Sequence, residues 1–452
     1  MIFKIMNSLL LFVFLIGISS PAPLPNLPAL KRVIKSVTVS PNTTNFLEKV
    51  PLLPLFVYGI LVIFAAFTFW TLRKCRAPKQ TTTARRKRAQ QNKYIKLRPR
   101  RRKRELVSLL NSNELDYDEN YELDPMHLTI GEQLGFGNFG IVNRGKLRNH
   151  LNVAIKKTLR PNDADQKKMI KDELMIMCAI GTHPCVLALV GAVTREGMDM
   201  MIVTEFADRG ALKDFLREIF KHGNFTDLLI YNGQGQKTGS YKKGHSLSRN
   251  MDSISTIDLV SFSYQIATGM VYLASIPCVH RDLALRNVLL MSDGTIRIGD
   301  FGLTRRQTEN KEYYRMANFD LQLPIKWMAP ECMENLKFCE KSDVWSFGVS
   351  LFEMFTLGET PYDKIDCMGF LNSGRRLEEP TYCHPEIYKY MKMCWGVDPV
   401  FRPTFGMCAE FFKGHLSLIN QNSYQTLEKK LDLIFEKRCE MERWVRGNSG
   451  RP

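Results

Sequence analysis

Three glycines in the segment LGFGNFGIV, at Gly135, Gly137 and Gly140, have a spacing that lets backbone amides close over the phosphates of a nucleotide. This pattern alone is weak, because it also fits dinucleotide-binding folds and ordinary hairpin turns. Here the flanking segments LTIGEQLG and IVNRGKL alternate like strands. The pattern therefore predicts the tip of a hairpin and not a strand-to-helix turn.

Lys156 ends the apolar run VAIK, on what is expected to be the next strand. A solvated strand lysine is the simpler interpretation, but three apolar residues run straight into it, so its ammonium group needs an internal partner. Glu173, in the helical pattern QKKMIKDELMIMCAI, is the best candidate. A lysine held by a helix glutamate can position the α- and β-phosphates of a nucleotide, as phosphoryl transfer requires.

A second group of charges lies in HRDLALRNVLL, residues His280 to Leu290, which carries one Asp, two Arg and one Asn within eight residues of an otherwise apolar stretch. With the two motifs above, DFG at 300–302 and APE at 329–331, this segment resembles the signature set of protein kinases, in the right order. The resemblance covers roughly Leu128 to Ile419. It implies an α+β, bilobal protein-kinase fold with a small β-rich lobe and a large helical lobe.

The resemblance also implies that ATP and Mg²⁺ bind, and it assigns roles to the charges. Asp282 is expected to accept the proton of a hydroxyl nucleophile, while Asn287 and Asp300 hold Mg²⁺ through oxygen atoms. A salt-linked structural turn is the alternative for this cluster. Thr204 takes the gatekeeper position, and the backbone of Glu205 and Ala207 bonds to adenine. The residues expected at the ATP site are Leu134, Gly135, Phe136, Gly137, Asn138, Phe139, Gly140, Ile141, Val142, Lys156, Thr204, Glu205 and Ala207.

Two stretches favour tyrosine as the residue that is phosphorylated. Serine/threonine kinases typically place Lys two residues after the base, where this chain has Ala284, whereas tyrosine kinases place a cation four residues after it, here Arg286. Leu285 departs from the usual tyrosine-kinase form but removes no functional group. The segment LPIKWMAPE resembles the platform on which a substrate tyrosine rests. A dual-specificity or serine/threonine kinase and a pseudokinase scaffold are the rival interpretations.

The formal net charge of the 452-residue chain is +17, and the excess is local. Between Arg73 and Arg104 there are 16 Lys and Arg and no acid, so the rest of the chain is nearly neutral. We therefore expect no nucleic-acid partner. A basic block of this kind is typical of a membrane topology signal, with added attraction to anionic lipids.

Two apolar runs precede that block. Residues 1–19 fit a cleaved signal peptide, although an uncleaved membrane helix would leave the topology of the rest unchanged. Leu52 to Leu72 is 21 residues without a charge, enough to span a hydrocarbon core of ~30 Å, which favours a transmembrane helix over a buried core helix. Residues 20–51 form a short extracellular stub with a glycosylation acceptor at Asn42. The prediction is a single-pass type I protein of the cell membrane with its remainder in the cytoplasm.

The cytoplasmic part divides further. A basic and then acidic juxtamembrane segment, 73–127, precedes the expected kinase domain at 128–419. The polar, glycine-containing stretch 221–253 is predicted to be a flexible insert, and its position resembles that of split receptor kinases such as the fibroblast and platelet-derived growth factor receptors. The tail, 420–452, contains an amphipathic helix candidate without an assigned role.

The segment between DFG and APE carries adjacent tyrosines, Tyr313 and Tyr314. The resemblance predicts that these are phosphosites, with Arg281 as a residue that contacts the phosphorylated loop, and that chains phosphorylate one another in trans. Exposed loop aromatics are the alternative. The resemblance also pairs Arg402 with Glu331.

Overall fold

The structure is a computed structural model that describes residues 117–137, 140–160, 163–195, 197–242, 251–276, 278–306, 314–315 and 323–448. The chain divides into two compact units, 1–85 and 86–452, and every described residue belongs to the second. The predicted signal peptide, stub with Asn42, transmembrane helix and basic block lie outside the described residues. No helix in the described ranges is long and apolar enough to cross a membrane.

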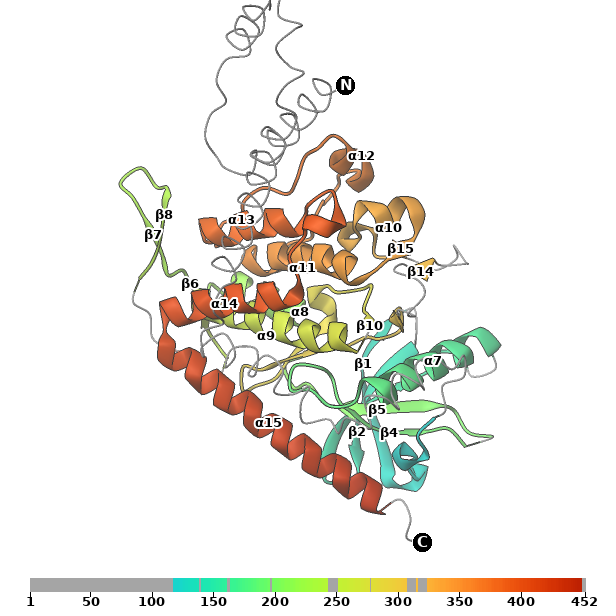
Figure 1. Ribbon diagram of the computed structural model, residues 1–452. Coiled ribbons are helices and arrows are strands. Elements are labelled where there is room, and N and C mark those ends of the chain that lie inside the picture. The colour runs from blue at the N-terminus through green and yellow to red at the C-terminus, as the bar shows by residue number, and fades with distance from the viewer. Residues whose placement is uncertain are drawn as a thin grey trace, which may run out of the picture. The chain divides into compact units, whose positions relative to one another are not determined.

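A five-stranded antiparallel sheet with one helix forms the small lobe (Figure 1). The strand order is β1-β2-β3-β5-β4, with bounds Leu128–Gly137, Gly140–Leu147, Leu151–Lys157, Met201–Glu205 and Leu189–Val193 respectively. Helix α7, Ala164–Ile180, begins where the Asp163 side chain accepts the backbone N–H groups of Asp165 and Gln166, and it ends at Gly181, which has a φ of 67°. These caps fix the two ends of α7, which lies beside the sheet.

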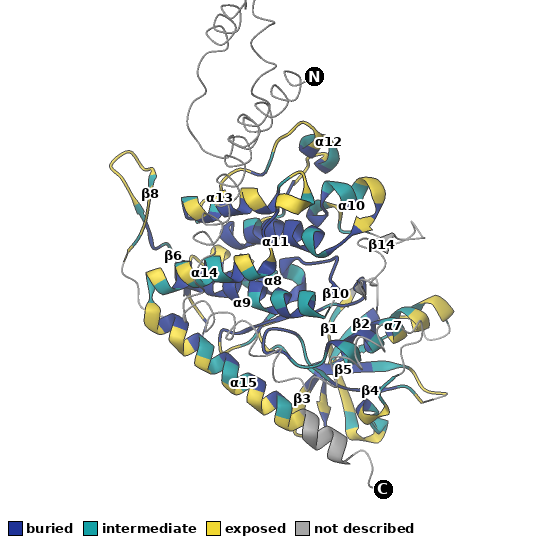
Figure 2. Cartoon of the chain, viewed as in Figure 1, coloured by how far each residue is buried: buried dark blue, intermediate teal, exposed yellow. Residues whose placement is uncertain are grey.

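The large lobe is built from helices around α9, which is buried on nearly all sides (Figure 2). A helix without a solvent face is mostly apolar on all sides, and buried polar residues of α9 such as Gln265 form hydrogen bonds within the lobe. Its first turn is fixed by a capping box between Ser255 and Asp258. The helices are α8 Leu212–Lys221, α9 Thr256–Ser275, α10 Pro330–Asn335, α11 Glu340–Phe355, α12 Cys367–Asn372, α13 Pro385–Cys394, α14 Phe405–Ile419 and α15 Gln421–Asn448.

Short two-stranded pairs complete the large lobe. The strands are β6 Phe225–Thr226 with β9 Ile254–Ser255, β7 Leu229–Tyr231 with β8 Lys237–Tyr241, β10 Cys278–Val279 with β13 Arg305–Arg306, β11 Val288–Leu290 with β12 Ile296–Ile298, and β14 Tyr314–Arg315 with β15 Lys337–Phe338. The β11–β12 pair is antiparallel, so residues just before β11 and just after β12 lie at the same end. This arrangement, with the sheet and helices above, confirms the predicted bilobal kinase fold for the described residues.

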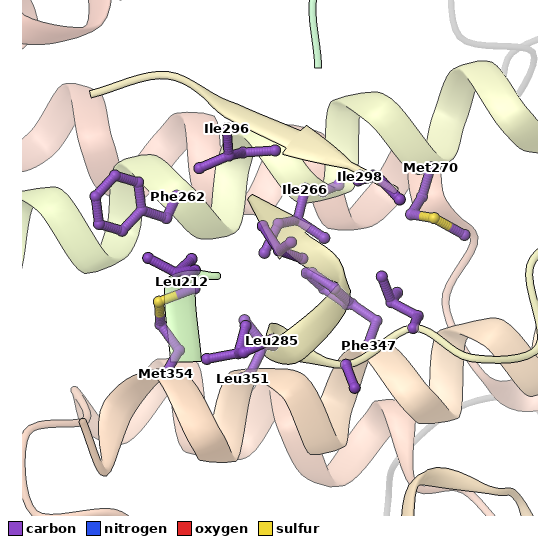
Figure 3. Close-up of a cluster of buried hydrophobic side chains, with 14 of the residues drawn as sticks. Leu212, Phe262, Ile266, Met270, Leu285, Ile296, Ile298, Phe347, Leu351 and Met354 are labelled. Atoms are coloured by element: carbon purple, nitrogen blue, oxygen red, sulfur yellow. The ribbon is translucent and has the colours of Figure 1, made fainter. Parts of the chain in front are cut away.

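The hydrophobic core of the large lobe holds the segment His280–Leu290, here called the catalytic loop (Figure 3). Leu285 of this loop is fully buried between α8 and α11, where it meets side chains such as Leu212 and Leu351. Full burial of one such side chain contributes about 1.5–3 kcal/mol. The apolar residue that departs from the usual sequence therefore anchors the loop.

The prediction of a flexible insert is wrong for its described part. Strand β6 pairs with β9, and the β7–β8 hairpin lies against the large lobe. The Lys237 ammonium contacts the Glu379 carboxylate at 2.7 Å, and the Tyr241 ring stacks on His384 with centroids 4.7 Å apart. These contacts, with residues more than a hundred positions away, order a segment whose composition alone predicts no ordered structure.

The folded region also begins earlier than the expected Leu128. The 3₁₀ turns η1, Glu119–Tyr121, and η2, Pro125–His127, precede the first strand. The Leu123 N–H donates to the Ala192 carbonyl of β4 at 2.7 Å, and Tyr121 is buried. The end of the acidic juxtamembrane segment is thus part of the small lobe.

The helix predicted in the tail is confirmed as α15, and it packs on the large lobe. Leu427 and Leu431 are buried, and the Tyr264 hydroxyl of α9 donates to the Glu428 carboxylate at 2.8 Å. One face of α15 is therefore part of the core.

The expected pair between Arg402 and Glu331 is also confirmed. The two guanidinium nitrogens of Arg402 donate to the two carboxylate oxygens at 2.6 and 2.8 Å, and the Arg402 side chain is fully buried. This bidentate contact joins the turn before α14 to α10.

We expect Arg402→Ala to lower the free energy of unfolding by about 3–5 kcal/mol, because it leaves the Glu331 carboxylate without its buried partner. Urea unfolding followed by circular dichroism measures the change. Lys389→Ala, which also removes one positive charge but at an exposed position of α13, serves as control and should change stability by less than about 0.5 kcal/mol. A loss below about 1 kcal/mol in Arg402→Ala would contradict this role for the pair.

Candidate active site

The glycine-rich segment is the connection between β1 and β2, as predicted. The antiparallel register pairs Gly135 with Val142 and Gly137 with Gly140, so the two strands stay paired up to the turn of the hairpin. Asn138 and Phe139, expected in the ATP site, lie outside the described residues. Gly140 has a φ of 140°, and a Cβ there would meet the Lys157 carbonyl oxygen at 2.3 Å. Glycine is therefore required where the hairpin passes next to β3.

Lys156 of β3 and Glu173 of α7 form the predicted ion pair. The Lys156 ammonium lies 2.8 and 2.7 Å from the two Glu173 carboxylate oxygens, and 3.5 Å from Oδ1 of Asp300 in the large lobe. Burial alone would lower the pKa of Lys156, but the two carboxylates hold it above its usual value. A charged ammonium thus joins the sheet, the helix and the start of DFG.

The backbone of the catalytic loop is held by a carboxylate from α11. Asp343 accepts the N–H of His280 at 2.7 Å and the N–H of Arg281 at 2.9 Å. Arg281 adopts a φ of 69°, a left-handed conformation that few residues other than glycine adopt. Burial raises the pKa of Asp343 to about 7 although both N–H groups favour the ionised form. The loop conformation therefore depends on α11.

Asp282, Arg286 and Asn287 lie together in one polar cluster. The Arg286 guanidinium pairs with Oδ1 of Asp282, while the Asn287 amide nitrogen donates to Oδ2 at 2.8 Å and to the Asp282 carbonyl at 2.7 Å. Burial raises the pKa of Asp282 to about 6, against the opposing effects of Arg286 and Asn287. The structure thus gives this carboxylate the raised pKa that suits a base working near neutral pH.

Arg286 also contacts the second stretch that favours tyrosine. Its guanidinium carbon lies 4.3 Å from the ring centroid of Trp327, in the 3₁₀ turn η4, Ile325–Trp327. The Trp327 indole donates to Oε2 of Glu353 at 2.8 Å, and the same oxygen accepts the N–H of Leu285 at 3.1 Å. The two stretches that favour tyrosine, one with Arg286 and one with Trp327, are therefore in direct contact. Glu353 has no local sequence signal, since its partners are distant in the chain.

The residues present suit a hard cation. Asn287 immediately precedes β11 and Asp300 follows β12, so the antiparallel pair brings both to one end, where the Gly299 N–H donates to the Asn287 carbonyl at 2.8 Å. The Asn287 amide nitrogen is used by Asp282, which leaves its side-chain oxygen as acceptor. Lys156 and the Gly302 N–H hold the pKa of Asp300 below its usual value despite burial. An ionised carboxylate and an amide oxygen are ligands that Mg²⁺ prefers.

The segment expected to bind adenine, Glu205 to Ala207, begins at the last residue of β5 and is here called the hinge. Thr204 pairs with Ala154 of β3 and is 8% exposed. The Glu205 N–H already donates to the Ala188 carbonyl at 3.1 Å. The Glu205 side chain enters an ion pair with Arg297 at 3.1 Å and another with Arg438, neither of which the sequence indicated.

One of the expected phosphosites, Tyr313, lies outside the described residues. The backbone of Tyr314 belongs to β14 and pairs with Phe338 of β15. The Arg281 guanidinium carbon lies 4.9 Å from the Phe338 ring centroid. Arg281, which is expected to contact a phosphorylated loop, is therefore close to β15, the strand that pairs with β14 of that loop.

Comparison with known proteins agrees with this geometry. Residues 128–412 match the family model of protein tyrosine and serine/threonine kinases. The Caenorhabditis elegans proteins receptor-like tyrosine-protein kinase kin-15 and tyrosine-protein kinase receptor old-1 are 43% and 41% identical, over 74% and 73% of this chain and 73% and 67% of their own lengths. Fibroblast growth factor receptor homolog 1 of Drosophila melanogaster is 38% identical over 67% of this chain and 40% of its own length.

We expect kcat/KM to fall as the pH decreases through about 6, because protonation of Asp282 removes the ionised carboxylate that a base requires. The profile is measured between pH 5 and 8 with the intact protein. Asp343→Asn removes a second carboxyl group with a raised pKa, on α11, so this slower variant should keep the acid limb. Loss of the limb in Asp343→Asn would assign the titration to Asp343 and contradict the assignment to Asp282.

Proposed function

Because the chain belongs to the protein tyrosine and serine/threonine kinase family, we propose that it is a receptor-type protein-tyrosine kinase, which transfers the γ-phosphate of ATP to tyrosine hydroxyls of proteins. One observation carries the choice of tyrosine: Arg286 lies between the Asp282 carboxylate and the Trp327 ring. The printed names of kin-15 and old-1 support the same choice.

In this proposal Asp282 accepts the proton of the substrate hydroxyl. The Arg286 guanidinium and the Asn287 amide each take one lone pair of a carboxylate oxygen, so each oxygen keeps a second acceptor position. The raised pKa of about 6 leaves Asp282 ionised at neutral pH yet basic enough to take a proton.

Lys156 orients the nucleotide. Glu173 orients the ammonium group, so that its N–H groups can donate to oxygen atoms of the α- and β-phosphates. Mg²⁺, when bound through Asn287 and Asp300, neutralises phosphate charge. The hairpin of Gly135 to Gly140 covers the phosphates with backbone amides, while the Glu205 carbonyl and the Ala207 backbone bond to adenine.

In this proposal, the stacked pair of Arg286 and Trp327 is the reason for the preference for tyrosine. A phenol oxygen lies farther from its backbone than a serine hydroxyl does, so the substrate backbone must stay farther from Asp282. The Arg286 guanidinium, stacked at 4.3 Å on the Trp327 ring, provides a rigid, flat support for the substrate ring beside the proposed base Asp282. Ala284, where serine/threonine kinases carry Lys, provides no cation.

Membrane anchoring is the second part of the proposal. Residues 52–72 would cross the membrane once, as a type I protein whose signal peptide is 1–19, with Asn42 glycosylated outside and residues 73–104 attracted to anionic lipids inside. Anchoring raises the local concentration of chains, which favours phosphorylation of one chain by another.

On matched peptides that differ only in the acceptor residue, we expect phosphate transfer to Tyr and hardly any to Ser or Thr. Phosphoamino-acid analysis of peptides incubated with MgATP gives the measurement. Asp282→Asn is the control for contaminating kinases and should lower kcat by about 10² to 10⁴-fold without changing the melting temperature appreciably. Mostly phosphoserine among the products would contradict the proposal.

We expect autophosphorylation of the parent protein to show a lag that shortens as its concentration rises. Each phosphate adds about −1.5 to −2 charges, which Arg281 can receive, so phosphorylation of Tyr313 and Tyr314 orders the loop. The double change of these two residues to Phe should leave the protein slow. Tyr231→Phe, at an exposed position of β7, should leave the lag unchanged. Equal rates of the double variant and the parent after full incubation would eliminate this switch.

A further inference from the structure

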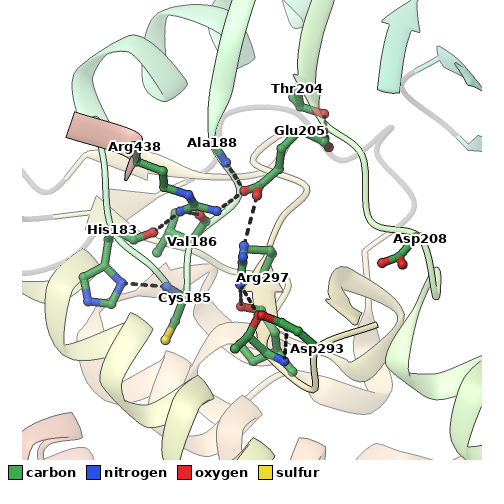
Figure 4. Close-up of polar contacts among 12 residues, drawn as sticks. His183, Cys185, Val186, Ala188, Thr204, Glu205, Asp208, Asp293, Arg297 and Arg438 are labelled. Carbon is green, nitrogen blue, oxygen red and sulfur yellow. Dashed lines mark hydrogen bonds and ion pairs between the residues drawn. The ribbon is translucent and has the colours of Figure 1, made fainter. Parts of the chain in front are cut away.

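Arg438 of the C-terminal helix reaches the back of the hinge (Figure 4). It is 9% exposed, and its NH1 donates to the carbonyl oxygens of His183 and of Val186, the latter at 2.9 Å. Its NH2 donates to Oε1 of Glu205. One guanidinium therefore joins the loop between α7 and β4 to the hinge.

Glu205 is the centre of these contacts. Its Oε1 also accepts the N–H of Ala188 at 2.8 Å, and its Oε2 accepts Nε of Arg297 at 3.1 Å. Although burial favours the protonated form, the two guanidinium groups hold the pKa of Glu205 below its usual value. The carboxylate is thus ionised and fixed by partners from β12 and α15.

The rest of α15 is fixed to the large lobe. In addition to the Tyr264–Glu428 bond, the rings of Tyr264 and Tyr424 meet edge to face at 5.9 Å, and the Lys430 ammonium donates to the Asp293 carbonyl. Arg438 lies about 15 Å along the helix from Glu428, at about 1.5 Å per residue. A helix that is rigid over this distance holds Arg438 at a fixed position relative to α9.

The hinge lacks close packing on this side. A cavity of about 110 Å³ borders it, lined by Tyr121, Ala188, Leu189, Val190, Glu205 and Arg438 among others. Beside this cavity, the Glu205 carboxylate is held by its polar contacts with Arg438, Arg297 and the Ala188 N–H. The Arg438 contact therefore links α15 to the last residue of β5, where the hinge begins.

We propose that Arg438 is a positioning residue for the nucleotide site: it fixes the Glu205 carboxylate and thereby the hinge backbone that bonds to adenine. The inference rests on the proposed function only in placing adenine at the hinge. It makes the C-terminal tail, which the sequence left without a role, a part of the ATP site. Without Arg438 the hinge samples other conformations, and apparent affinity falls with the fraction that is competent to bind.

We expect Arg438→Ala to raise both the KM and the dissociation constant for ATP by about five- to tenfold, with kcat within about twofold of the parent. Arg438→Lys keeps the charge but cannot span His183 and Glu205 together, so an intermediate value is expected. The matched control is Lys437→Ala, which removes the same charge from the neighbouring exposed position and should leave both constants unchanged.

Binding is measured by titration calorimetry with MgATP on full-length, detergent-solubilised protein, and melting curves confirm folding of each variant. Unchanged affinity in a folded Arg438→Ala or Arg438→Lys variant would overturn the inference, as would a fall in kcat alone. If Arg438→Ala does not fold, Arg438→Lys decides. A parent protein that binds MgATP but transfers no phosphate would refute the proposed function and leave the binding comparison valid.

Discussion

A buried ammonium group, that of Lys156, is the constraint on which the rest of the structure depends. An ion removed from water costs several kcal/mol unless it is paired, so an apolar strand that ends in Lys requires carboxylates nearby. Glu173 and Asp300 supply them from α7 and from the other lobe. Since β3 pairs with β2 on one side and β5 on the other, the same strand also fixes the glycine hairpin and the hinge relative to that charge.

The large lobe uses carboxylates in a second way, as acceptors for backbone N–H groups. Asp343 and Glu353, both on α11, bind the N–H groups of His280, Arg281 and Leu285. Burial raises the pKa values of both carboxyl groups, so the helix retains them at an energetic cost. In return, they stabilise a loop whose left-handed residue and clustered charges have no stability of their own. The position of the proposed base is therefore set by two carboxylates of α11.

Local patterns were sufficient to predict the glycine hairpin, the Lys156–Glu173 pair and the helix in the tail, because spacing and periodicity encode them directly. The Arg402–Glu331 pair followed from the family resemblance. The contact of Arg286 with Trp327 has no signal in the sequence, although each residue lies in a segment that resembles tyrosine kinases, since a sequence does not show which distant segments meet. Arg438 and Glu205, 233 positions apart, show the same limit more strongly. The ordered part of the insert was missed because its contacts, such as that of Lys237 with Glu379, outweigh a composition that favours disorder.

The parallel pair β6–β9 brings the two ends of the insert together beside the start of α9, where the Leu228 N–H also donates to the Thr256 hydroxyl at 3.0 Å. The insert is thus closed at its base by hydrogen bonds that need nothing from the residues farther out. Because each doubling of a loop's length costs only about 0.6 kcal/mol, such a closed base tolerates large changes in what it encloses. In evolutionary terms, the length and sequence of the enclosed segment are free to change while the transfer site remains intact.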